Sequence, residues 1–79
     1  MLNESSLLEE RISEIVRRVG SISDLAPDED YYDAGLTSLA ALSLLLELED
    51  AFGLSISDEK FIACRNVRAL ATTIEDSKR

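Results

Sequence analysis

Ser38 is the side chain in this sequence best placed to take part in chemistry. It follows an acidic and aromatic segment, residues 29–37, and opens a long apolar stretch. A catalytic serine needs a neighbouring base and a third group that orients that base. The sequence holds no histidine, and no lysine lies near Ser38. Gly35 precedes the serine but no glycine follows it closely, whereas a nucleophile elbow has glycine on both sides. The pattern indicates a serine that another enzyme modifies, and we expect the protein not to be an enzyme.

We predict no metal site in the acidic segment. If a calcium loop began at Asp30, Tyr32 and Ala34 would stand at ligand positions. Ala41 would also replace the glutamate that closes such a loop. The single Cys64 excludes a multi-cysteine zinc site and an internal disulfide, and we expect it to be a partly buried packing residue.

The charge distribution narrows the choice of partners. The 79 residues carry a net charge of −8, and ten acidic residues lie between Arg18 and Lys60 with no basic residue among them. Such a surface repels nucleic acid and anionic lipid and favours basic patches on protein partners. The alternative is a solvated face that only keeps a small domain soluble. No apolar run approaches the ~20 residues of a membrane span, and the N-terminus lacks a signal-peptide pattern. We therefore expect a cytoplasmic monomer that binds neither nucleic acid nor membrane.

The apolar spacing predicts an all-α fold, a small four-helix bundle with three longer helices and one short one. Ser6 and Glu9 have the spacing of a capping box at the start of the first helix, and Gly20 is placed to end it. A long loop, residues 21–36, follows. The second helix is expected over residues 37–52, with Gly53 ending it. We expect residues 1–79 to form one domain.

The last two helices have weaker signals. Ser57 or Asp58 is expected to begin a short helical turn that runs through Phe61 and Ile62. Asn66 is a credible N-cap for a closing helix with Val67, Leu70 and Ile74 on its apolar face.

The second helix is apolar on two sides. One face is suited to the core and holds Ala41, Leu44, Leu45, Leu48 and Phe52. Leu39, Leu42 and Leu46 fall outside that face, and one helix in a small bundle cannot bury both sides. An exposed apolar strip with an acidic rim is typical of a docking surface. The alternative is that neighbouring helices wrap further around it.

The run from Asp30 to Leu39 resembles the phosphopantetheine attachment motif of acyl and peptidyl carrier proteins, in which a glycine lies three residues before a serine followed by leucine. The resemblance continues through Leu48-Glu-Asp-Ala-Phe-Gly-Leu-Ser-Ile56 and the closing helix, so it covers nearly the whole chain. It implies that Ser38 receives a 4′-phosphopantetheine arm from coenzyme A, whose thiol holds an acyl or aminoacyl group as a thioester. The implied partners are a phosphopantetheinyl transferase, an ATP-dependent amino acid or acyl ligase, and a downstream transferase or synthase.

The same resemblance implies a partner surface after the serine along the second helix and on the next loop. Its expected residues are Thr37, Leu39, Ala40, Ser43, Leu46, Glu49, Asp50 and Ile56. Carriers of fatty acid synthesis usually have aspartate before the serine, where this chain has Thr37. The Tyr31-Tyr-Asp-Ala-Gly35 run is similar to peptidyl carrier domains and favours a free-standing carrier of an amino acid or specialised acyl group. The alternatives are an acyl carrier for fatty acid or polyketide synthesis, a non-covalent acidic helical adaptor, and a degenerate carrier fold without the arm.

Overall fold

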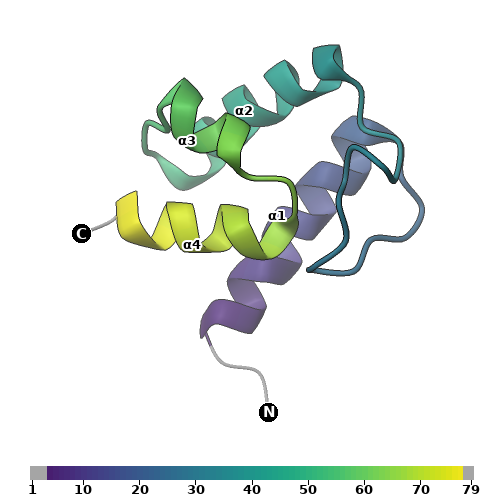
Figure 1. Ribbon diagram of the computed structural model, residues 1–79. Coiled ribbons are helices and arrows are strands. Elements are labelled where there is room, and N and C mark those ends of the chain that lie inside the picture. The colour runs from purple at the N-terminus through teal and green to yellow at the C-terminus, as the bar shows by residue number, and fades with distance from the viewer. Residues whose placement is uncertain (1–3, 78–79) are drawn as a thin grey trace.

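The computed structural model describes residues 4–77, which form four helices and no strand. The helices are α1 (Glu4–Gly20), α2 (Ser38–Phe52), α3 (Asp58–Ala63) and α4 (Val67–Ser77). α1 packs against α2 and α4, and the short α3 contacts α4 (Figure 1). The loop of residues 21–37 descends from the end of α1 to the start of α4 and then returns to α2. The predicted all-α bundle with a long first loop is confirmed.

Capping interactions explain where α2, α3 and α4 begin. Thr37 has extended backbone, and its side-chain oxygen accepts a hydrogen bond from Ala40 N. Ser57 Oγ does the same for Lys60 N, and Asn66 Oδ1 accepts from Ala69 N over 2.8 Å. Each cap satisfies an amide that has no partner inside the helix. The predicted caps at Ser57 and Asn66 are confirmed, and Thr37 caps α2 rather than forming its first turn.

The C-terminus of α2 is also as predicted. Gly53 adopts the left-handed conformation with φ 63°, and its amide bonds to the carbonyl oxygen of Glu49. Glycine adopts this conformation without the steric cost that a side chain brings.

The start of α1 differs from the prediction, whereas the helix ends at Gly20 as predicted. The helix already includes Glu4, so Ser6 lies within it and does not cap it. Serine–glutamate spacing arises inside a helix as well as at its start, so the spacing misplaced the boundary. Gly20 is the last helical residue, and Ser21 takes the left-handed conformation with φ 55°. Gly20 serves a close approach instead, because a Cβ there would lie 3.0 Å from Leu36 Cδ1.

The core lies between α1, α2 and α4. On α2 the predicted core face is buried at Ala41, Leu44, Leu45 and Leu48, whereas Phe52 is half-buried. The other predicted face is exposed, with 84% of Leu39 and 60% of both Leu42 and Leu46 accessible to solvent. The prediction that one helix cannot bury both sides is therefore confirmed. No helix within residues 4–77 combines the length and apolar character needed to cross a membrane.

Candidate functional site

Ser38 is exposed and is the first residue of α2. Thr37 satisfies the amides of Ala40 and Ala41, through its side-chain and carbonyl oxygens respectively. The amides of Ser38 and Leu39 make no hydrogen bond to any residue that the structure describes. Amides at the start of a helix favour a nearby negative group, such as a phosphate, typically by about 0.3–1 kcal/mol when exposed. A phosphodiester on the Ser38 oxygen would sit beside such amides.

A tight turn delivers the chain to Ser38. Asp30 Oδ1 accepts hydrogen bonds from the amides of Tyr32 (2.8 Å) and Asp33 (3.3 Å), which folds the acidic segment back on itself. Gly35 N then bonds to the Tyr32 carbonyl, and Leu36 N to the Tyr31 carbonyl. Gly35 has φ 127°, a conformation that side-chain-bearing residues rarely adopt. Position 35 therefore requires glycine, because a residue with a side chain would be strained in this backbone conformation.

The same turn is fastened to the segment between α3 and α4. Tyr31 is fully buried; its amide donates to the Arg65 carbonyl and its hydroxyl to the Cys64 carbonyl. Arg65 Nε donates to Asp30 Oδ2 over 2.6 Å, and this hydrogen bond lowers the pKa of the Asp30 carboxyl. Burial raises the pKa of the Tyr31 hydroxyl, with a smaller contribution from Tyr32. Sequence reasoning missed the Asp30–Arg65 pair, because its members lie 35 positions apart and leave no local signal.

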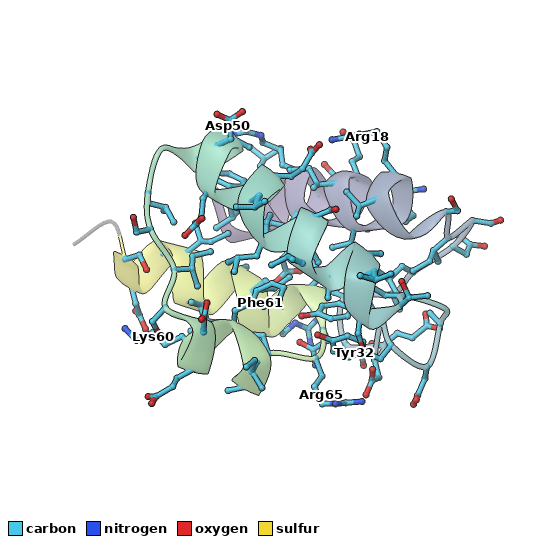
Figure 2. The ribbon with its side chains drawn as sticks, turned by 90° about the horizontal axis from the view of Figure 1, so that it is seen from above. Arg18, Tyr32, Asp50, Lys60, Phe61 and Arg65 are labelled. Carbon is cyan, nitrogen blue, oxygen red and sulfur yellow. The ribbon has the colours of Figure 1, made fainter. Side chains whose placement is uncertain are left out.

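A groove of about 500 Å³ opens beside Ser38, between α2 and α3. Apolar side chains from both helices make most of its lining, and the remainder comes from the Ser38 end of α2, the preceding loop and Arg65. The lining residues are Tyr32, Ser38, Ala41, Leu42, Leu45, Asp58, Phe61, Ile62 and Arg65. Figure 2 shows Tyr32 and Arg65 together near one end of α2, with Phe61 between the helices. The groove offers an apolar surface within the immediate surroundings of the exposed hydroxyl.

The predicted partner residues do not all reach the surface. Five of the eight are exposed along α2 or at its cap: Thr37, Leu39, Ser43, Leu46 and Asp50. Ala40 is half-buried against the core. Glu49 accepts a hydrogen bond from Ile56 N over 2.9 Å, so its side chain holds the next loop. Ile56 itself is only 5% exposed, which places it in the core and not on the expected surface.

Ile62 was missed and belongs to the exposed apolar surface, with 70% of the residue accessible. It follows the buried Phe61 in the short α3. Adjacent helical residues lie 100° apart, and of these two only Phe61 reaches the core. The neighbouring apolar pair gave no local signal for this, because Leu44 and Leu45 are also adjacent and are both buried.

One acidic residue beside the exposed apolar face of α2, Glu47, is paired with a basic residue. Arg18 on α1 forms an ion pair with Glu47 on α2 at 2.6 Å, and the hydrogen bond lowers the pKa of the Glu47 carboxyl. Figure 2 shows Arg18 on the same side of the molecule as Asp50, away from Tyr32 and Arg65. The residues from 4 to 77 include no cluster of three side chains suited to holding a metal ion.

Comparison with known proteins identifies the family of this chain. A family model described as "Phosphopantetheine attachment site" matches residues 7–74. The chain belongs to that family. Members bind a covalently attached 4′-phosphopantetheine, and as carriers they are generally non-catalytic. Carrier proteins of this family generally interact with phosphopantetheinyl transferases and with synthases or other transferases.

A relative agrees with this assignment. The chain is similar to a protein of Ureaplasma parvum serovar 3 (strain ATCC 700970) named "Acyl carrier protein homolog", with 38% identity over 42 residues. The match covers 53% of this chain and 54% of that protein, so it spans about half of each.

The residues of this carrier fit the cofactor. The hydroxyl of Ser38 is exposed at the start of α2, where the amides of Ser38 and Leu39 have no hydrogen-bond partner among residues 4–77. The adjacent groove is open and apolar. A phosphodiester can therefore form on Ser38 without displacing a packed side chain.

Proposed function

We propose that Ser38 is the attachment residue and that the protein carries an aminoacyl or acyl group on its arm. The observation that carries this proposal is the exposure of Ser38 at the first residue of α2. The Ser38 oxygen forms a bond to the phosphorus that joins pantetheine to the rest of coenzyme A. The pyrophosphate bond breaks, the adenosine bisphosphate half leaves, and the hydroxyl proton passes to a base of the transferase. The arm then supplies a thiol that holds its cargo as a thioester.

The surroundings of Ser38 favour an aminoacyl or specialised acyl cargo over the bulk fatty acid pathway. Thr37 occupies the position where carriers of fatty acid synthesis usually have aspartate, and here it is the helix cap. The next exposed residues are Leu39, Leu42 and Ser43, none of them acidic. A partner that docks on this face of α2 beside Ser38 therefore meets apolar and uncharged polar side chains.

A carrier for fatty acid or polyketide synthesis is the second candidate, and the groove supports it. Leu42, Leu45 and Phe61 give the groove an apolar lining that suits a hydrocarbon chain. The similarity to a protein named as an acyl carrier homologue is in keeping with this alternative.

The first experiment measures the intact mass after incubation with coenzyme A, Mg²⁺ and a phosphopantetheinyl transferase. The wild type is expected to gain one phosphopantetheinyl group and Ser38→Ala none. Ser23→Ala is the control, because Ser23 is an exposed serine outside the expected partner surface. If Ser38→Ala gains the group, or if folded wild type gains nothing with several transferases, the proposal is wrong.

A second experiment separates the cargoes. The carrier with its phosphopantetheine arm attached is incubated with amino acids and fatty acids, ATP and ligases from the native host. The thioester that forms is identified by its mass. Transfer of an amino acid supports the first candidate, and transfer of fatty acids alone supports the second.

The remaining alternative is a non-covalent adaptor that acts through the exposed strip of α2. For an adaptor, Ser38→Ala is silent, whereas Leu46→Asp abolishes partner binding. For a carrier, Ser38→Ala removes function altogether. Leu46 is 60% exposed, so its replacement is expected to leave the fold intact in either case.

A further inference from the structure

Arg65 joins two segments that the chain places far apart. It lies between α3 and α4, and its Nε donates to Asp30 Oδ2 in the loop that leads to Ser38. Its guanidinium carbon also lies 4.9 Å from the centre of the Tyr32 ring, in a cation–π contact. We call Asp30, Tyr32 and Arg65 the loop clamp. Figure 2 shows Tyr32 and Arg65 next to each other at the loop side of α2.

The clamp holds the turn that determines where Ser38 lies. Asp30 organises that turn by accepting the amides of Tyr32 and Asp33 through its other oxygen. The Tyr31 carbonyl then receives Leu36 N over 2.9 Å, and Leu36 is buried two residues before Ser38. Asp30 is therefore connected to the start of α2 by one short, hydrogen-bonded turn.

The clamp also borders the site itself. Tyr32 and Arg65 line the same groove as Ser38. Of the three ion pairs formed by residues 4–77, only the Asp30–Arg65 pair involves the loop. The pairs of Arg18 and Arg68 instead join helices, α1 to α2 and α4 to α1.

We propose that Arg65 is a positioning residue for the modification of Ser38, acting by clamping the loop through Asp30 and Tyr32. This inference rests on the proposed attachment at Ser38. Arg65 does not take part in the chemistry; it reduces the number of conformations in which the turn presents the serine to the transferase.

The other contacts of the turn do not use the Arg65 side chain, so the inference can be tested by substitution. The Arg65 carbonyl still accepts the amide of Tyr31, and the Tyr31 hydroxyl still bonds to Cys64, when the Arg65 side chain is changed. Arg65→Gln is therefore expected to fold. Arg68→Gln is a matched control, because both arginine side chains are about 60% exposed and both form an ion pair. The two variants also change the net charge equally.

Two measurements are made on the apo proteins. The first is kcat/KM for the carrier in transfer from coenzyme A, and the second is amide hydrogen exchange in residues 31–36. Arg65→Gln is expected to lower kcat/KM and to speed exchange of the loop amides, each roughly two- to fivefold, as for loss of an exposed ion pair. The KM for coenzyme A should not change, because coenzyme A binds to the transferase. Arg68→Gln should change neither quantity.

Asp30→Asn shows whether Arg65 acts through the loop. Asparagine keeps an oxygen that can accept the amide of Tyr32, but it loses the charge that pairs with Arg65. If the clamp is the cause, Asp30→Asn slows modification as Arg65→Gln does, and the double variant is no slower than either single variant.

Four outcomes would overturn the inference. Asp30→Asn could leave modification unchanged while Arg65→Gln slows it, which would mean that Arg65 touches the transferase directly. Loop exchange could stay at the wild-type rate in Arg65→Gln. Arg68→Gln could slow modification as much as Arg65→Gln does. Finally, the wild type could remain unmodified, in which case the proposed attachment fails together with the positioning role. If the positioning role alone fails, the wild type is still modified.

Discussion

The hydroxyl of Tyr31 donates a hydrogen bond to the backbone carbonyl of Cys64 over 3.0 Å, in the interior of the protein. The bond links the turn before Ser38 to the end of α3 across 33 residues of sequence. Tyr31 is 0% exposed, whereas Tyr32 beside it is half-buried and meets it edge to face at 5.0 Å. The two tyrosines of the motif therefore have different roles, one in the core and one at the groove.

Tyr31→Phe is expected to destabilise the protein by about 1 kcal/mol. The ring stays buried, but one hydrogen bond is lost, and a buried carbonyl loses a partner. Urea denaturation measures the change. Tyr32→Phe is the control, because the Tyr32 hydroxyl makes no hydrogen bond to a residue in 4–77, and its effect should stay within about 0.5 kcal/mol. Equal effects of the two substitutions would contradict the assigned role of the Tyr31 hydroxyl.

Alkaline pH should lower the free energy of unfolding of the wild type, because the Tyr31 hydroxyl ionises more readily in the unfolded chain. Burial raises the pKa of this hydroxyl in the folded protein, so the unfolded chain loses the proton first, near pH 10. The stabilising contribution is therefore complete below about pH 10 and is lost as the pH rises towards the folded pKa. Free energies of unfolding at pH 9 and pH 11 should differ more in the wild type than in Tyr31→Phe. An identical difference in both proteins would exclude Tyr31 as the source.

The three glycines are expected to respond differently to alanine. Gly35→Ala forces a side chain into a backbone with φ 127° and should cost about 1–3 kcal/mol, although the space around it is open. Gly53→Ala, at φ 63°, should cost about 1–2 kcal/mol. Gly20→Ala should be close to neutral, because the gain in helix propensity offsets the crowding of the flexible Leu36 and Ile22 side-chain ends. Thermal unfolding of the three variants gives the ranking, and Gly20→Ala as the most damaging change would contradict it.

Low salt is expected to loosen the protein. The net charge is −8, and each of the three ion pairs in residues 4–77 lies partly exposed at the surface. Repulsion among the remaining carboxylates extends over about 30 Å at 0.01 M salt and about 10 Å at 0.1 M. The melting temperature should therefore rise with NaCl and rise further with MgCl₂ at matched ionic strength. A melting temperature that neither salt changes would count against this prediction.

Local signals in the sequence were enough to place most of the helix boundaries and the exposed face of α2. Gly53, Ser57 and Asn66 act at the positions where they stand, because a cap involves only residues three or four apart. The exposure of Leu39, Leu42 and Leu46 followed from helical geometry, which gives a single helix more apolar surface than a small bundle can cover.

The remainder depends on contacts between distant segments. The Asp30–Arg65 pair and the burial of Tyr31 arise where the long loop meets the segment between α3 and α4. The burial of Ile56 depends on the core as a whole. Nothing within a few residues of Asp30 indicates which of the basic residues will reach it. The start of α1 was misplaced because the spacing of Ser6 and Glu9 is compatible with a cap and with a helix interior.

The environment of Cys64 has a practical consequence for anyone who works with this carrier. The cysteine is the only one in the sequence, it is 4% exposed, and its sulfur lies 3.3 Å from both the Lys60 carbonyl and the Thr73 hydroxyl. Such a buried thiol reacts slowly. If the arm is attached as proposed, its terminal sulfur is the one fast-reacting thiol of the folded protein. A maleimide titration under native conditions would then count unloaded arms directly, and the difference before and after hydroxylamine treatment would give the fraction that carries cargo.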